Sequence, residues 1–209
     1  MDGPARRRQR IEDALGQRLG WVSCAIEAIY HRHNVSAVLR TADALGIHRV
    51  HLVEGKFTPA KGAARGAERW LDLRWDTDPR DTIAAIRAEG RQLWIADLAD
   101  PPVAPEQIPL DRPVCLWFGA ELSGVGPEAR AAADGVVTIP MRGFAQSLNI
   151  SVAAALAMRS VAERARAEHG DRALLPADQR ERTLAEWLAR DEHMDIGIAA
   201  RAAARWDTP

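Results

Sequence analysis

The spacing of apolar residues along the chain predicts strands that alternate with helices. Short apolar runs predict strands at 21–30, 49–53, 70–75, 92–97, 113–118 and 136–139. Apolar residues at helical spacing predict helices at 5–19, 35–45, 79–89, 127–133, 147–168 and 179–190. This alternation is typical of an α/β fold, so we expect a mainly parallel sheet with helices on both faces and further helices at the termini.

The helix predicted at 35–45 carries apolar and polar residues on different sides. Its apolar positions repeat at helical spacing and form one face, which consists of Val35, Val38, Leu39, Ala42 and Leu45. Ser36, Arg40 and Asp43 lie on the other side. We therefore expect these three side chains to point away from the core.

The same patterns divide the chain into three parts. A basic helical arm at 1–20 precedes an α/β domain at 21–168, and a helical extension follows at 169–209. Within the α/β domain, the segment 98–112 contains four prolines and is predicted to be a long loop. Long ordered loops in compact domains are often functional.

Composition narrows the class of protein. Of the 209 residues, 47% are hydrophobic and 27% are charged, as in soluble globular proteins. No run approaches the roughly 18 apolar residues of a membrane span, and the first residues lack the apolar core of a signal peptide, which predicts a cytoplasmic protein. Cys24 and Cys115 fall in predicted strands, where isolated cysteines are more often buried apolar residues than a disulfide pair.

Positive charge is distributed unevenly. The net charge is −1, so overall charge does not predict nucleic-acid binding. Arginines nevertheless cluster near the start of the chain, at Arg6, Arg7, Arg8, Arg10 and Arg18. Such a run could bind phosphate groups, or it could equally form the solvated face of a terminal helix.

The stretch IPMRGFAQSLNIS, at 139–151, is the strongest candidate for a functional site. An apolar strand stops at Pro140, Gly143 permits a turn, and a helix begins at Ser147 or Asn149. Ser147 and Asn149 can accept hydrogen bonds from the free N–H groups of the first helical turn, and a helix start can also receive an anion. The alternative is an ordinary capped helix after an ordinary strand.

Other polar candidates follow predicted strands. The residues in question are Asn34, Arg40, Glu121 and Asn149. Ligands of parallel α/β sheets bind beyond the carboxyl ends of the strands, where these residues are expected. His31 and His33 could ligate a metal, but no cysteine or carboxylate cluster lies nearby in the sequence, so no metal site is expected. The sequence also contains no glycine-rich nucleotide fingerprint and no serine elbow.

Three stretches together resemble the motifs of the SPOUT class of RNA methyltransferases. They are NVSAVLRTADALG at 34–46, LWFGAELSGVG at 116–126 and IPMRGFAQSLNISVAAALAM at 139–158. Each motif alone is moderately specific, but all three in this order and spacing are very specific. Within the class, the chain resembles the tRNA guanosine-2′-O-methyltransferases (the TrmH family) from about residue 6 to about residue 188.

The resemblance implies features that residue spacing alone does not. It implies that the C-terminal part of the sheet is tied in a trefoil knot that binds S-adenosyl-L-methionine, and that two copies form a homodimer whose active sites contain residues of both. By the same resemblance, the cofactor contacts would be Ala96, Gly119, Ile139 and Leu148. The catalytic positions would be Asn34, Arg40, Glu121, Ser147 and Asn149.

The resemblance also assigns roles toward RNA. Arg40 would be central to activating the ribose 2′-OH. Because a guanidinium rarely gives up its proton, we expect Arg40 to hold an RNA phosphate and to stabilise the developing alkoxide, with Asn34 and Glu121 fixing its pose. The resemblance further favours RNA contact by the basic arm, through Arg6, Arg7, Arg8 and Arg10, and by Arg142.

The function expected from this resemblance is ribose 2′-O-methylation of tRNA at the D-loop guanosine at position 18. One alternative is a ribosomal RNA 2′-O-methyltransferase of the same superfamily. Those relatives often carry a separate N-terminal RNA-binding domain, whereas only about 20 residues precede the first predicted strand here, which favours tRNA. The other alternative is a catalytically silent RNA-binding protein that keeps the fold.

Overall fold

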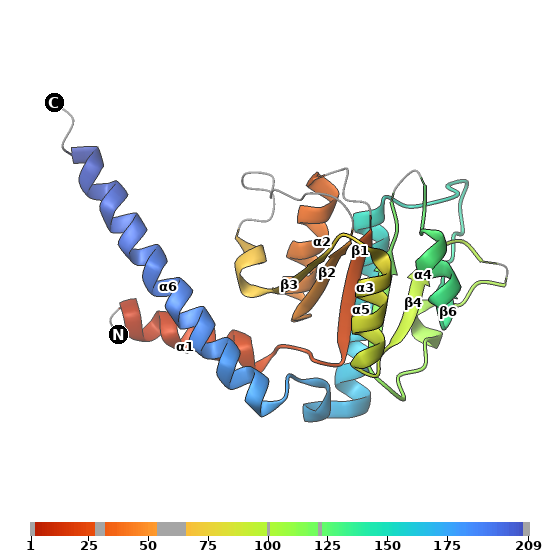
Figure 1. The fold of residues 1–209 in the computed structure, drawn as a ribbon, viewed down its shortest axis with the longest axis horizontal. Coiled ribbons are helices and arrows are strands. Elements are labelled where there is room, and N and C mark those ends of the chain that lie inside the picture. The colour runs from red at the N-terminus through yellow and green to blue at the C-terminus, as the bar shows by residue number, and fades with distance from the viewer. Residues whose placement is uncertain (1–2, 28–31, 54–65, 100, 121–122, 207–209) are drawn as a thin grey trace. The chain divides into compact units, whose positions relative to one another are not determined.

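The computed structural model describes residues 3–27, 32–53, 66–99, 101–120 and 123–206. The chain divides into two compact units, of which the larger comprises residues 19–174 and the smaller combines residues 1–18 with residues 175–209. Their elements are shown in Figure 1. Among the described residues, no helix is both long and apolar enough to cross a membrane.

A parallel sheet forms the centre of the larger unit. Its six described strands are β1 Val22–Glu27, β2 Arg49–Val53, β3 Asp72–Asp76, β4 Gln92–Ala96, β5 Val114–Phe118 and β6 Gly135–Val137. They lie in the order β3-β2-β1-β5-β4-β6, and every neighbouring pair is parallel. The prediction of a mainly parallel sheet is therefore confirmed, and the carboxyl ends of these strands lie at one edge.

Helices cover both faces of this sheet. On one face, α2 (Arg32–Ala44) and α5 (Ile150–His169) pack against each other, and α5 lies against β1 and β5. On the other face, α3 (Pro79–Ala88) and α4 (Pro127–Ala132) pack against each other and against β4. The larger unit also contains the 3₁₀ helices η1 (Ala67–Trp70), η2 (Pro105–Gln107) and η3 (Gly170–Ala173).

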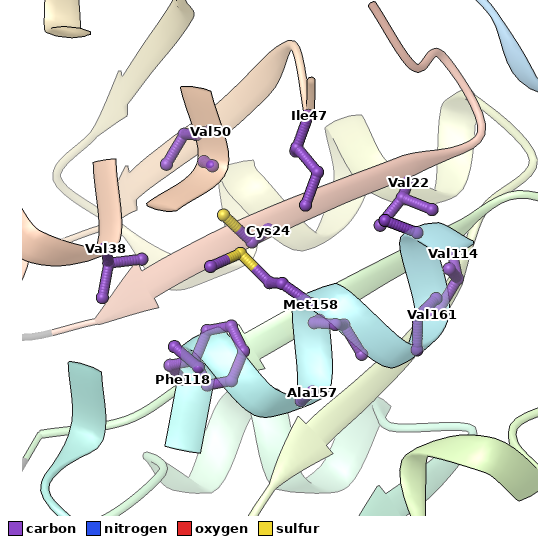
Figure 2. Close-up of a cluster of buried hydrophobic side chains, with 14 of the residues drawn as sticks. Val22, Cys24, Val38, Ile47, Val50, Val114, Phe118, Ala157, Met158 and Val161 are labelled. Carbon is purple, nitrogen blue, oxygen red and sulfur yellow. The ribbon is translucent and has the colours of Figure 1, made fainter. Parts of the chain in front are cut away.

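Successive strand residues alternate between two hydrophobic cores. Cys24 of β1 packs near Met158 of α5 in the first core (Figure 2), whereas the next residue, Ala25, belongs to the second core with Trp117 of β5. Burial on both faces explains why the strands read as continuous apolar runs in the sequence. Cys115 also belongs to the second core, so the two free cysteines lie on opposite faces, and the prediction that they do not pair is confirmed.

One face of α2 differs from the prediction. Ser36 is fully buried, so the expectation that it points away from the core is wrong. The reason is that α2 packs against both α5 and η1, which buries a wider part of its surface than its apolar stripe indicates. Arg40 is exposed as expected, and Asp43 is partly buried.

The elements beside the candidate loop also have different limits from those predicted. β6 ends at Val137 rather than at residue 139, because its pairing with β4 stops there and the N–H of Thr138 bonds instead to the carbonyl of Val103. α5 begins at Ile150 with Asn149 as its N-cap, so Asn149 and not Ser147 marks the start of this helix. Trp70, predicted to begin a strand, lies in η1 instead.

The smaller unit pairs α1 (Gly3–Gly16) with α6 (Ala177–Trp206). Ile11 of α1 is buried, and the guanidinium of Arg18 lies 5.0 Å from the ring centroid of Trp187. The helix α6 continues to Trp206, well past its predicted end at residue 190. Alanine and arginine, which dominate residues 199–205, are among the strongest helix formers and account for this extension.

A buried histidine lies in β2 without a hydrogen-bonding partner in the described part of the chain. His51 is on the sheet face that α3 covers, and both of its ring nitrogens are orphaned. Burial, followed by the positive charges of Arg49 and Arg91 and opposed by Glu89 and Asp76, lowers its pKa from 6.5 to about 4. The folded state therefore favours the neutral ring.

We expect His51 to make folding acid-sensitive. Because its pKa is about 4 when folded and 6.5 when unfolded, the unfolded chain binds more protons between these values, and stability falls as the pH drops through this window. The total loss is on the order of 3 kcal/mol, and above pH 6.5 the group has no effect. His51→Leu should remove this component, which denaturant unfolding at about pH 7.5 and about pH 4.5 would measure. An unchanged pH dependence in the variant would contradict the assignment.

Candidate functional site

A cavity of about 320 Å³ lies at the carboxyl ends of β4, β5 and β6. Its lining residues come from four segments: 96–98 at the end of β4, 118–120 at the end of β5 together with Gly124, residues 137–139 and Met141 at the end of β6, and residues 147–150 with Ala153 and Ala157 at the start of α5. Its position is the one at which parallel α/β sheets bind ligands. The lining is largely apolar with polar groups at the carboxyl ends of the strands, which suits an organic ligand that carries several polar groups.

The cavity brings together residues that the sequence analysis proposed from separate motifs. Its lining includes the expected cofactor contacts Ala96, Gly119, Ile139 and Leu148. It also includes Ser147 and Asn149 from the expected catalytic set. The structure thus places these six residues around one space, and their individual roles remain predictions.

Backbone atoms form the wall of the cavity at Gly119. A Cβ atom at this position would lie 2.2 Å from the carbonyl carbon and oxygen of Gly124 and 2.4 Å from the nitrogen of Val125. The close approach is held by Ala120 and Gly124, each of which donates its N–H to the carbonyl of the other at 2.9 Å. Gly124 has a φ of 68°, a conformation that favours glycine. Only glycine at 119 therefore permits this wall.

An acidic side chain that the sequence analysis did not select also lines the cavity. Asp97 directly follows β4, and its carboxylate accepts a hydrogen bond from the N–H of Leu98 at 2.7 Å and pairs with Arg130. Its backbone is held as well, because the Thr138 hydroxyl donates to the Asp97 carbonyl at 2.6 Å. The available signal was its place as the last residue of the strand predicted at 92–97.

Asn149 links the start of α5 to α2. Its Oδ1 accepts hydrogen bonds from the N–H of Ser151 at 2.9 Å and from the Ser151 hydroxyl at 2.6 Å, which is the capping role expected of it. Its Nδ2 donates to Oδ1 of Asn34 at 3.3 Å. Asn34 does not itself line the cavity, and this bond connects it to the cavity's edge.

Other expected site residues lie elsewhere or outside the described residues. Arg40 is exposed on α2 and is not part of the cavity lining. Glu121 and His31 fall outside the described residues, so their predicted roles are untested by the structure. Ser147 is exposed at the cavity edge, and no hydrogen bond to a neighbouring base marks it as a nucleophile within the described residues.

The expected RNA-binding arginines differ in their exposure to solvent and in their ion pairs. Arg6, Arg10 and Arg142 are exposed. Arg7 is partly buried and pairs with Asp191 of α6 at 2.6 Å. Arg8 is exposed but pairs with Glu12 one helical turn away at 2.9 Å. Arg7 therefore has a structural role within the smaller unit, whereas Arg6 and Arg10 present their charge to solvent.

The fold and the cavity together define a class of protein. A parallel α/β sheet with a ligand cavity at the carboxyl ends of its strands, closed by a capped helix start, is an arrangement of enzymes that bind a small organic ligand. Because many chemistries share such folds, the class alone leaves the reaction open.

Comparison with known proteins supplies the family. Residues 22–159 match the SpoU rRNA Methylase family, and the chain belongs to this family. The resemblance to the SPOUT class of RNA methyltransferases that the sequence motifs indicated is therefore confirmed.

Two relatives that align over most of the chain carry the same name. A protein of Escherichia coli strain K12 named tRNA (guanosine(18)-2′-O)-methyltransferase is 36% identical over 183 residues, which cover 85% of this chain and 80% of that protein. A Thermus thermophilus protein of the same name is 35% identical over 188 residues, which cover 88% of this chain and 96% of that protein.

Solved structures agree with the fold. The Aquifex aeolicus TrmH/SpoU tRNA modifying enzyme superposes with a TM-score of 0.80 at 28% identity, covering 90% of this chain and 97% of that chain. An AdoMet-bound rRNA methyltransferase from Sinorhizobium meliloti has a TM-score of 0.59 at 25% identity, covering 74% of this chain and 60% of that chain. The expected α/β fold is thereby confirmed, while the knot in it stays a prediction.

Two substitutions should separate the roles of Asn149. Asn149→Ala removes the cap and should lower the free energy of unfolding by about 1 kcal/mol. Asn149→Asp keeps the capping oxygen but loses the Nδ2 donor to Asn34, so its stability should stay near that of the wild type. Denaturant unfolding of the three proteins measures this, and equal losses in both variants would show that the cap is not what the side chain contributes.

Proposed function

We propose that the chain transfers a methyl group from S-adenosyl-L-methionine to the ribose 2′-OH of tRNA, at the D-loop guanosine at position 18. The observation that carries this proposal is the gathering of Ala96, Gly119, Ile139, Leu148 and Asn149 around one cavity. The named activity of the relatives from Escherichia coli and Thermus thermophilus supports the same reaction and substrate.

The cavity fits the cofactor by its shape and its chemistry. A side chain at position 119 would enter the backbone of Gly124, so the wall there offers main-chain groups to a ligand. Phe118, Val137 and Ile139 add an apolar surface, and Asp97 adds a fixed carboxylate. When bound, S-adenosyl-L-methionine would supply an activated methyl group, so the chain needs neither a metal nor a covalent nucleophile.

The work left to the protein is alignment and management of the proton that leaves the ribose hydroxyl. The bond between Asn149 and Asn34 holds the start of α5 to α2, the helix that also carries Arg40. Arg40 is exposed, where its planar guanidinium can hold an RNA phosphate and stabilise the developing alkoxide. Ser147 shapes the cavity edge, and Glu121 is assigned to the pose of Arg40 from its motif alone.

Methyl transfer from labelled S-adenosyl-L-methionine to an unmodified tRNA transcript tests the proposal. We expect 2′-O-methylguanosine at position 18, and no product at that position when the transcript carries 2′-deoxyguanosine there, because the acceptor oxygen is absent. Methylation of ribosomal RNA instead would overturn the substrate and retain the chemistry. Cofactor binding without transfer to either RNA would favour a silent RNA-binding protein.

The same assay examines Arg40 and the basic arm. Arg40→Lys should lose most turnover, because an ammonium cannot provide the planar paired donors of a guanidinium.

Replacing Arg6 and Arg10 with glutamine should leave kcat unchanged and raise the KM for tRNA. It should also reduce by about two the slope of the logarithm of tRNA affinity against the logarithm of salt concentration. Arg8→Gln, at an arginine already paired with Glu12, is the matched comparison and should change KM less. An unchanged salt slope in the double variant would exclude the arm from RNA binding.

We also propose that the protein is a homodimer. Val152 and Leu156 lie one turn apart on α5 and are 46% and 47% exposed, and Phe144 is fully exposed. Large exposed apolar side chains that form a patch are typical of a surface that a partner covers. Light scattering should give twice the mass of one chain, and Leu156→Glu should reduce it to one; a monomeric wild-type protein would refute the proposal.

A further inference from the structure

A buried carboxylate lies below the cavity wall and has no role in the function proposed above. Glu27 is the last residue of β1 and is only 5% exposed. Its Oε2 accepts a hydrogen bond from Nε1 of Trp117 at 2.7 Å and another from the N–H of Gly126 at 3.0 Å. These partners come 90 and 99 residues later in the chain, so the carboxylate joins β1 to the segment that follows β5.

Gly126 is shaped to receive this carboxylate. Its backbone has φ −64° and ψ 161°, an ordinary extended conformation that any residue adopts, so backbone freedom does not require glycine there. A Cβ atom at this position would lie 2.2 Å from Oε1 of Glu27. The side chain of Glu27 therefore occupies the space that a side chain at 126 would need, and the two residues form a matched pair.

Gly126 comes two residues after Gly124, which forms part of the cavity wall. Gly124 is hydrogen-bonded to Ala120 in both directions and lies directly against Gly119, and all three line the cavity. Gly119 and Ala120, at the start of the wall, are held in place because they directly follow β5. After Gly124, the main chain is held at Gly126 by the hydrogen bond from its N–H to Glu27.

Burying the Glu27 carboxylate costs free energy, which indicates that it is there to position the main chain that it binds. Removing a carboxylate from water is costly, and an apolar side chain of similar size in this core would be at least as stable. What an apolar side chain cannot do is accept the N–H of Gly126 and so fix that main chain at one distance from β1. The arrangement is thus better explained by positioning than by stability.

We propose that Glu27 is a positioning residue for cofactor binding. By holding Gly126, it fixes the approach of Gly124 to Gly119 and Ala120 and so keeps the cavity wall in the shape that receives S-adenosyl-L-methionine. The identity of this ligand rests on the proposed function, whereas the positioning of the wall does not.

Four variants test the inference through calorimetric binding of S-adenosyl-L-methionine. Glu27→Ala removes both hydrogen bonds and should weaken binding about tenfold. Gly126→Ala displaces the carboxylate from the other side and should weaken binding to a similar degree. The double variant should be no worse than Glu27→Ala alone, because the added methyl then meets no carboxylate. Glu27→Gln keeps an oxygen that can accept both bonds and should bind within about threefold of the wild type.

Controls separate positioning from loss of structure. Gly16→Ala adds the same methyl group where no atom lies within 4 Å and should bind the cofactor normally. In steady-state assays, Glu27→Ala and Gly126→Ala should raise the KM for S-adenosyl-L-methionine and leave the KM for tRNA unchanged. Folded Glu27→Ala and Gly126→Ala proteins that bind the cofactor like the wild type, or losses that add fully in the double variant, would overturn the inference.

Amide hydrogen exchange distinguishes failure of this inference from failure of the proposed function. Glu27→Ala should speed exchange at Gly124 and Gly126, while Glu27→Gln should not. If the wild-type protein binds no S-adenosyl-L-methionine, the proposed function fails and the exchange result still judges whether Glu27 holds the wall. Unchanged exchange in Glu27→Ala would overturn the positioning role whatever the ligand.

Discussion

The site depends on a place where two stretches of backbone lie too close for a side chain between them. Gly119 leaves β5 directly against Gly124, and the paired hydrogen bonds between Ala120 and Gly124 close the turn. Main-chain atoms therefore form the cavity wall at this point. This wall lies at the carboxyl ends of the central strands because every strand pair in the described sheet is parallel.

That geometry is possible because the strands beneath it are rigid. β1 and β5 are buried on both faces and hold the residues next to the turn in fixed positions at the edge of the sheet. Burial in two cores leaves these strands few alternative registers, since a shift by one residue would exchange Cys24 and Ala25 between cores of different shape. The sheet thus positions the turn, and the turn forms the wall.

Much of the fold could be predicted from the sequence because its signals are local. Strands buried on both faces read as apolar runs, and the cap of α5 reads as an asparagine before an alanine-rich helix. The predictions that proved wrong failed for a different reason. Ser36 is buried on α2, a helix that packs against η1 and α5. β6 stops where its partner β4 no longer pairs. Both facts depend on residues distant in the sequence. The strand order likewise follows from pairings that no local pattern specifies.

The residues of the candidate site also differ in whether a local sequence signal identifies them. Asn149 could be identified from its capping position, and its place after a strand, like that of Asn34, predicted that both lie at the ligand-binding edge of the sheet. The bond between them joins residues 115 positions apart, and no local pattern specifies it. Glu27 had no such signal. A glutamate inside the strand predicted at 21–30 normally suggests a solvated charge, and only its burial and its two distant donors show otherwise.

The glycines of this turn show why a residue type alone is ambiguous. Gly124 has a positive φ, so its conformation excludes most side chains wherever its neighbours lie. Gly119 and Gly126 are limited instead by what occupies the adjacent space, which is backbone in one case and the carboxylate of Glu27 in the other. The sequence shows three glycines close together after a strand and cannot distinguish these causes. A substitution at Gly126 could be tolerated if position 27 also changed, whereas a substitution at Gly119 would have to move the main chain.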